Sequence, residues 1–467
     1  MSEPHEMTAA ELSAAYKSKE LSPVEAAEAL LGRIEALDAQ VNAFCHIDAP
    51  MTLQQAEASE ARWMAEEPLS PLDGVPVAVK DLLLTKGWAT RRGSLTVDPK
   101  GPWEEDAPTV ARLREAGAVF IGKTTTPEFG WKGSTDSPLT GITRNPWNLR
   151  KTPGGSSGGS SAALAARLCP LALGTDGGGS IRIPASFTAT YGLKPSFGRV
   201  PAYPLSPFGT VAHVGPMSRT VRDSALMMNA ISKPDARDWF NVPGEIADYT
   251  ARLGERLKGK RIAFSPRLGY AKKVLPEVEA LVAAAVKRFE AVGAHVEQVD
   301  PSTDDPSEIF QTLWWAGAGY LLGDLPEEKK AQLDPGLRKM ADEGAKIPMR
   351  KYLAATAARG ALGSKVRQFM ERYDFIITPS TATPAFDVGQ LSPLEDDGRA
   401  WMQWTPFSFP FNLTQQPAAS INCGFTSDGL PVGLQIVGRM FDDAGVLAAS
   451  AAYEGADPHF DKVPDGF

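Results

Sequence analysis

Two short serine–glycine segments and one lysine are the residues of this sequence best suited to chemistry. Residues 154–159 read Gly-Gly-Ser-Ser-Gly-Gly, and residues 174–180 read Gly-Thr-Asp-Gly-Gly-Gly-Ser. Upstream, the apolar run 75–79 ends at Lys80. A serine hydroxyl becomes a good nucleophile when a neighbouring base takes its proton. A lysine can be that base if burial lowers its pKa from about 10.4. Nucleophilic chemistry at a serine is therefore one interpretation of these segments. Taken alone, such a segment is more often a structural loop, and a lysine at a strand end is more often exposed.

Three letter patterns point to other chemistry, and two of them are excluded on physical grounds. Residues 117–124 match a phosphate-binding P-loop, but the middle of the match is bulky and strand-like, and Pro127 follows soon after. Residues 77–80 resemble the strand-borne lysine of protein kinases, but no glycine-rich loop precedes them. Residues 154–158 match the nucleophile elbow of α/β-hydrolases. A Ser-His-Asp hydrolase therefore stays as an alternative, with three candidate histidines: His213, His295 and His459.

The composition of the chain is that of an ordinary globular protein. Of its 467 residues, 43% are hydrophobic and 22% are charged, which excludes disorder and fibrous structure. The net charge of −8 argues against a nucleic-acid partner, because such proteins usually carry a basic surface. Residues 161–174 are mostly small and apolar, but Arg167 and Pro170 interrupt them, so no membrane span is expected. The 43 glycines and 38 prolines indicate many turns or a glycine-lined site.

The cysteines and the N-terminal residues indicate the cellular compartment in which the protein is expected. Cys45, Cys169 and Cys423 lie far apart in the sequence, so we expect three unpaired, buried thiols in a reducing compartment. Glu3 and Glu6 stand in the first residues without an apolar run, so no signal peptide is expected and the protein is predicted to be cytoplasmic. No cluster of metal-ligating residues is evident, and acyl transfer by a serine needs no metal or cofactor, so none is predicted.

Alternating helices and strands must position these residues. The apolar spacing of residues 23–37 predicts an amphipathic helix, and residues 22–25 form a capping box with proline at the first helical position. Short apolar runs predict buried strands at 75–79, 118–121, 171–173, 261–264 and 375–378. The alternation predicts an α/β fold with a mixed, mostly parallel central sheet covered by helices on both faces. No low-complexity linker divides the chain, so we expect a single domain over residues 1–467.

The segment 151–199, with its two serine–glycine loops, closely resembles the amidase signature family. Further stretches resemble the same family at 71–81, 122–124, 145–147, 410–414 and 429–438. The resemblance covers roughly residues 5–450. It divides the chain into a signature core of about 71–200, a variable substrate-pocket region of about 201–409 and a C-terminal block of about 410–450.

The resemblance implies a Ser-cisSer-Lys triad. In this sequence Ser180 is the implied nucleophile, Ser156 the bridging serine after a cis peptide bond, and Lys80 the base. The resemblance also implies an oxyanion hole from the N–H groups of the loop before the nucleophile, namely Gly177, Gly178 and Gly179 with Ser180. The family often has threonine or isoleucine where Gly177 stands, so we expect a more flexible loop. Three residues are expected to support the loops: Asp176, Arg182 and Ser157.

The substrate is indicated only as a chemical class. The resemblance implies hydrolysis of a small-molecule amide, and tryptophans in the variable segments favour an aryl or bulky apolar group. The candidate pocket segments are 126–131, 204–210, 314–317 and 401–409. Aryl carbamates (urethanes) and esters are further candidates. We expect the chain to act as a monomer or homodimer; the alternative is an amidotransferase A-type subunit that uses glutamine for tRNA-dependent transamidation.

Overall fold

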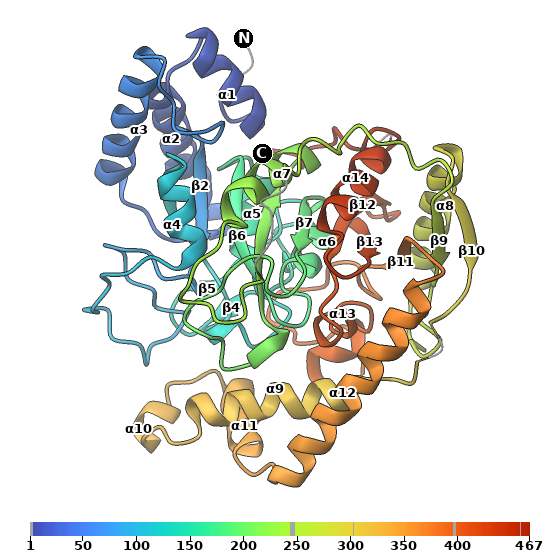
Figure 1. Cartoon of the computed structure of the whole chain (residues 1–467). Coiled ribbons are helices and arrows are strands. Elements are labelled where there is room, and N and C mark those ends of the chain that lie inside the picture. Colours follow the sequence, from blue (N-terminus) through green and yellow to red (C-terminus); the bar gives the residue numbers. More distant parts are fainter. Residues whose placement is uncertain (1–2, 243–247, 302, 396–397, 458) are drawn as a thin grey trace.

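A mixed sheet of 11 strands crosses the molecule and carries the motifs of the sequence (Figure 1). The computed structural model describes residues 3–242, 248–301, 303–395, 398–457 and 459–467. From one edge to the other, the strands of the sheet are β1 (Phe44–His46), β3 (Val119–Thr124), β2 (Pro76–Lys80), β6 (Leu171–Asp176), β8 (His213–Ser218), β7 (Tyr191–Lys194), β12 (Ala418–Phe425), β13 (Pro431–Gly438), β11 (Phe375–Pro379), β9 (Arg261–Phe264) and β10 (His295–Gln298). A separate small sheet pairs β4 (Asp136–Ser137) with β5 (Gly141–Ile142).

The α/β class and the mixed sheet are confirmed, but the prediction that the sheet is mostly parallel is wrong. Parallel pairing joins β2 to β3 and β6, and β9 to β10 and β11. The other six neighbouring pairs of the sheet are antiparallel. The short connection from β12 to β13, for example, reverses the chain and lays the two strands side by side. A buried apolar run in a sequence indicates a strand without indicating its direction.

The helices follow from local sequence signals. The predicted helix at 23–37 extends over Pro23–Val41, and the Ser22–Glu25 capping box is present. The helices are α1 (Ala9–Ser18), α2 (Pro23–Val41), α3 (Ala49–Met64), α4 (Pro108–Glu115), α5 (Gly158–Ala165), α6 (Arg182–Thr188), α7 (Val221–Ile231), α8 (Pro276–Ala291), α9 (Ser307–Leu322), α10 (Glu327–Lys330), α11 (Pro335–Gly344), α12 (Met349–Met370), α13 (Pro410–Leu413) and α14 (Asp443–Glu454). Three short 3-10 helices lie at Glu128–Gly130, Gly209–Val211 and Ala400–Trp404.

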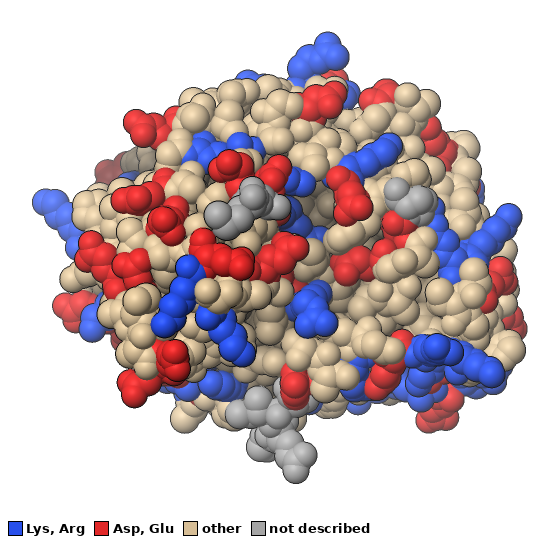
Figure 2. All heavy atoms as spheres, turned by 90° about the horizontal axis from the view of Figure 1, so that it is seen from above, with Lys and Arg blue, Asp and Glu red and all other residues tan. Residues whose placement is uncertain are grey.

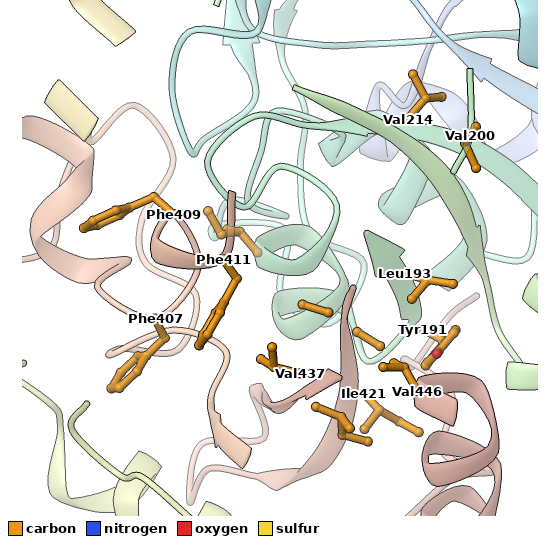
Figure 3. Packing of buried hydrophobic residues seen from close by; sticks show 14 of the residues in the cluster. Tyr191, Leu193, Val200, Val214, Phe407, Phe409, Phe411, Ile421, Val437 and Val446 are labelled. Carbon is orange, nitrogen blue, oxygen red and sulfur yellow. The ribbon is translucent and has the colours of Figure 1, made fainter. Parts of the chain in front are cut away.

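Helices cover both faces of the sheet, as predicted. Adjacent residues of a strand point to opposite faces. On β7, the Tyr191 hydroxyl lies 3.1 Å from Ser450 Oγ of α14, whereas a side chain at Gly192 would meet Ala185 of α6 at 3.0 Å. α14 and α6 therefore lie on opposite faces. Figure 3 shows Tyr191 beside Val446 of α14 in the apolar core between this helix and the sheet.

The pairing of β2 with β6 determines where the chemically active residues meet. These neighbouring strands are parallel, with Val79 opposite Leu173, so their carboxyl ends lie at the same edge. β2 ends at Lys80 and β6 ends at Asp176. α5, which follows Ser157, packs against both strands. The lysine strand and both serine–glycine segments therefore converge at one edge.

The surface carries charges of both signs, and the cysteines form no disulfide bond. On the face shown in Figure 2, acidic and basic side chains are interspersed. Among the helices of the described residues, none combines the length and apolar character needed to cross a membrane. All three cysteines are unpaired, and Cys169 and Cys423 are buried. The prediction of burial is wrong for Cys45, which is exposed because it lies on the edge strand β1.

Candidate active site

Lys80 is completely buried at the end of β2, within a cage of three hydroxyl groups. Its Nζ lies 2.7 Å from Ser156 Oγ, 2.9 Å from Ser157 Oγ and 2.9 Å from Thr175 Oγ1. Burial lowers the pKa of Lys80 well below its ordinary value, and the charge of Asp176 opposes this only in part. The cage therefore favours a neutral amine, which has a lone pair that can take a proton.

The hydrogen-bond partners of the three hydroxyl groups limit which of them can donate to the lone pair of Lys80. Ser157 Oγ lies 3.2 Å from the carbonyl oxygen of Thr175, to which only the hydroxyl can donate. Ser157 therefore accepts from Lys80 and cannot also donate to it. The neutral amine has a single lone pair, so only one of the two remaining hydroxyls, Ser156 or Thr175, can donate to it. Thr175 received no role in the sequence analysis, although its place before Asp176 at the end of β6 was a usable signal.

The two serine segments are held in close contact. The Gly155–Ser156 peptide bond is cis, as the family resemblance implied. A side chain at Gly155 would lie 2.7 Å from the carbonyl oxygen of Ser134, so glycine is required there. The N–H of Ser157 donates to the carbonyl of Ser180 at 3.1 Å. This bond fixes the position of the predicted nucleophile relative to the lysine cage.

Asp176 and Arg182 organise the loop that ends at Ser180. The Arg182 guanidinium lies 2.8 Å from Asp176 Oδ1, and both side chains are fully buried. Although burial disfavours a charged carboxylate, this guanidinium holds the pKa of Asp176 below its usual range. Arg182 also donates to Gln435 of β13 and to Asn412 of α13, at 2.6 Å each. The two residues thus tie the loop to the C-terminal block.

The carboxylate of Asp176 also changes which amides are available as an oxyanion hole. Its Oδ1 accepts the N–H of Gly179 at 2.7 Å, so the inclusion of Gly179 among the oxyanion donors is wrong. Gly179 instead supplies a left-handed backbone conformation, with φ of +127°. Within the described part of the chain, the N–H groups of Gly177, Gly178 and Ser180 have no protein acceptor. These three can donate to a developing oxyanion.

Aromatic rings occupy the space beside these glycines. A Cβ at Gly177 would lie 2.6 Å from the ring of Trp314, and one at Gly178 would lie 2.7 Å from Phe310. Trp314 stacks between Phe208, with ring centroids 3.7 Å apart, and Phe310, at 5.3 Å. Packing against this aromatic stack accounts for the glycine at 177, in place of the flexibility expected from the sequence.

The candidate histidines are not placed to activate the nucleophile. His213 lies beside the loop, but its Nδ1 is 2.8 Å from a backbone carbonyl and therefore carries the proton, while its Nε2 faces Lys194 Nζ at 3.4 Å. Burial and the neighbouring Lys194 hold the pKa of His213 well below its ordinary value. His295 is exposed on the edge strand β10, and His459 packs its ring against a phenylalanine. The Ser-His alternative has no geometric support.

A cavity of about 290 Å³ opens onto both serines, Ser156 and Ser180. Three predicted pocket segments contribute to it, through residues 129–130, 204–209 and Trp314. The prediction is wrong for the fourth segment, 401–409, which is buried behind the loop, where Ser408 Oγ donates to the Gly178 carbonyl at 2.6 Å. The cavity is also lined by residues that the sequence analysis did not predict, among them Leu82, Leu83, Arg92, Ala107, Pro108 and Thr109. Within the residues described, no group of three histidine, cysteine or carboxylate side chains is arranged to hold a metal ion.

Similarity to known proteins identifies the family. A family model described as Amidase matches residues 25–447. The chain belongs to the amidase signature family. An acylamidase of Rhodococcus erythropolis is 37% identical to it over 98% of this chain and 97% of the relative. A solved bacterial aryl acylamidase of the amidase signature (AS) enzymes family superposes with a TM-score of 0.93 at 32% identity, covering 100% of both chains.

A second kind of relative within the amidase signature family belongs to an amidotransferase. The A-type subunit of the glutamyl-tRNA(Gln) amidotransferase of Myxococcus xanthus (strain DK1622) is 36% identical over 96% of this chain and 97% of the relative. Family membership and the acylamidase relatives make this chain an amide-hydrolysing enzyme, a serine amidohydrolase.

Proposed function

We propose that this amidohydrolase cleaves small-molecule amides with an aryl or bulky apolar group, through an acyl-enzyme intermediate on Ser180. The observation that carries the proposal is the buried Lys80 amine, 2.7 Å from Ser156 Oγ, at a cavity that Ser156 and Ser180 both line. The rings of Trp314 and Phe208 at the cavity wall and the likeness to an aryl acylamidase support the aryl group.

Each half of the reaction uses the same proton path. Ser180 Oγ attacks the carbonyl carbon and gives its proton to Ser156, whose own proton moves to the lone pair of Lys80. The carbonyl electron pair moves onto oxygen, which accepts hydrogen bonds from Gly177, Gly178 and Ser180. The C–N bond then breaks, and the amine leaves with a proton returned through Ser156. Water attacks the acyl group by the same path, releases the acid and restores Ser180.

The proposal also covers the supporting residues, the range of substrates and the state of the enzyme. Asp176, Arg182 and Ser157 position the loops and the lysine. Aryl carbamates and esters present a carbonyl of similar shape and are included as substrates. Neither a metal nor a cofactor takes part. We place the enzyme in the cytoplasm, acting as a single domain over residues 1–467 and as a monomer or homodimer.

A second candidate function is that of the amidotransferase A-type component, which the 36% identity to the Myxococcus xanthus protein supports. That function requires a partner complex that transfers ammonia from glutamine to a charged tRNA. Turnover of a simple amide by the purified chain therefore separates the two candidates.

The test is hydrolysis of acyl 4-nitroanilides by the purified chain alone. We expect release of nitroaniline, loss of activity by at least about 10³-fold in Lys80→Ala and Ser180→Ala, and unchanged activity in the control His295→Ala. No release from any anilide, together with glutamine hydrolysis that depends on amidotransferase partners, would support the second candidate instead.

A further inference from the structure

The cavity wall contains an arginine that the proposed mechanism does not use. Arg92 lines the cavity and is half-buried. Among the residues that the structure describes, its side chain has neither a hydrogen-bond nor an ion-pair partner. Burial lowers the pKa of Arg92, but a guanidinium stays charged in proteins. A partly desolvated cation without a counter-ion is unfavourable, and an anionic group of a ligand would relieve this cost.

Three carboxylates around this region are already occupied by other partners. Asp81, whose charge acts on Arg92, forms an ion pair with the buried Lys123 at 3.1 Å. Asp176 is paired with Arg182. Asp238, on the cavity wall, accepts two backbone N–H groups at 2.9 Å each. None of these carboxylates, which all lie in the described part of the chain, neutralises Arg92.

The start of α4 adds a second feature that favours negative charge. Residues 107–109 line the same cavity, and the helix begins without a side-chain cap. The Ala107 N–H donates to the Leu84 carbonyl and Pro108 has no N–H, so among the described residues the open N–H groups at this helix start are those of Thr109 and Val110. Such N–H groups carry partial positive charge, which attracts anions. Thr109 is fully buried, and within the described residues its Oγ1 has no hydrogen-bond partner. An unpartnered hydroxyl and an uncapped helix start thus share the wall with Arg92.

The backbone places Arg92 on the Ser156 side of the cavity. The Arg92 carbonyl accepts the N–H of Phe129 at 2.8 Å. A Cβ at the next residue, Gly130, would lie 3.2 Å from Ser156 Oγ. In the proposed mechanism Ser156 returns the proton to the leaving amine, so this wall faces the amine half of the substrate. The aromatic wall of Trp314 instead packs on the oxyanion loop.

We infer that Arg92 and the start of α4 form an anion subsite for a carboxylate on the amine half of the substrate. The inference rests on the proposed function, since the role of Ser156 defines the amine half. A guanidinium binds a carboxylate through two parallel hydrogen bonds, which orients the group as well as attracting it. The substrate class is therefore an N-acyl amino carboxylate, with an N-acyl aminobenzoate as an aryl example.

The test compares a matched pair of anilides, 4-acetamidobenzoate and the neutral 4-acetamidotoluene. The measured quantity is the ratio of their kcat/KM values. Arg92→Met should lower this ratio at least about tenfold relative to the unaltered enzyme, since a partly desolvated ion pair is worth about 1.4 kcal/mol or more. General damage to the catalytic residues would lower both rates and leave the ratio unchanged. A ratio that does not change in Arg92→Met would overturn the inference.

The neighbouring Arg91 provides a matched control, because it donates to the carbonyl of Ser94 and is not a lining residue of the cavity. Arg91→Met should leave the ratio as it is. Succinyl 4-nitroanilide carries its carboxylate on the acyl half. If Arg92→Met lowers its kcat/KM more than that of 4-acetamidobenzoate, the assignment to the amine half is wrong.

Failure of the subsite can be told apart from failure of the proposed function. If the enzyme hydrolyses no anilide, calorimetric binding of 4-acetamidobenzoate to the intact enzyme and to Arg92→Met still tests the subsite. At least about tenfold weaker binding to Arg92→Met supports it, and equal binding overturns it whatever the turnover result.

Discussion

At the residue scale, the proposed mechanism depends on the Lys80 amine, whose pKa burial lowers well below its ordinary value. A general base must be unprotonated, so kcat/KM should rise with pH through the pKa of Lys80 and then level off. Because burial lowers that pKa well below its ordinary value, the plateau should be reached well below the ordinary lysine value of about 10.4. The pH dependence of kcat/KM on a neutral anilide measures this. A rise centred on the ordinary lysine value would contradict it.

Thr175 provides the variant that tests the cause of this profile. Its hydroxyl lies 2.9 Å from Lys80 Nζ and can accept from a charged amine, which helps to stabilise the charge. Thr175→Val should therefore lower the pKa of Lys80 further and move the rise in kcat/KM to lower pH. Since a hydrogen bond to a charged group is worth about 1.5–3 kcal/mol, the shift should be about one pH unit or more. Thr175→Ser, which keeps the hydroxyl, should retain the original profile.

At the element scale, α9 shapes the active site from outside the sheet. Figure 1 shows this helix in a group with α11 and α12 at the bottom of the molecule. α9 presses Trp314 against Gly177 and Phe310 against Gly178. The loop of residues 176–180 therefore contacts both the segment that precedes and forms α13 and the helix α9.

A methyl group at residue 177 should disturb this contact. Its carbon would lie 2.6 Å from the Trp314 ring, so Gly177→Ala should lower kcat by roughly tenfold, as expected when overpacking costs about 1–3 kcal/mol. Trp314→Ala makes room, so the same change should cost less in that background. Steady-state kinetics of the two single variants and the double variant give the coupling, which we expect at about 0.5–3 kcal/mol.

Gly360 of α12 is the matched control, because a Cβ there meets nothing within 4 Å. Gly360→Ala should leave kcat unchanged and stabilise the helix slightly. Additive effects of the changes at 177 and 314 would show that the ring does not set the position of the loop.

At the scale of the whole molecule, local motifs were predictable and long-range packing was not. The convergence of Lys80, Ser156 and Ser180 could be predicted because each stands in a short, distinctive pattern that resembles a known family, and the fold brings these segments together. Arg92 carries no such pattern, since its importance comes only from the cavity that distant segments build around it. The segment 401–409 was misassigned because apolar aromatic residues look alike in a sequence whether they line a cavity or fill the core behind it. The direction of each strand could not be predicted either, because it depends on the path of the chain between strands, and a local sequence pattern does not determine that path.

The packing of the C-terminal helix α14 against the middle of the chain can be tested through Glu454. This carboxylate, at the end of α14, accepts the N–H of Val221 at the start of α7 at 2.7 Å. Burial raises its pKa from 4.5 to about 7. A raised carboxyl pKa means that the folded state binds the proton more tightly than the unfolded state. Its contribution to stability is therefore complete below pH 4.5 and is lost as the pH rises to about 7.

Glu454→Gln removes this titration while it keeps an oxygen that can accept from Val221. Relative to the unaltered protein, the variant should gain roughly 1–3 kcal/mol of unfolding free energy between about pH 5 and about pH 8. Urea unfolding of both proteins at the two pH values measures the gain. Any effect of the amide group that does not depend on pH is the same at both pH values, so it cancels in the comparison. The exposed Glu371 loses the same charge in Glu371→Gln and should show no such gain. An equal pH dependence for Glu454→Gln and the unaltered protein would mean that Glu454 stays ionised in the fold, and that the contact between α14 and α7 is insensitive to its charge.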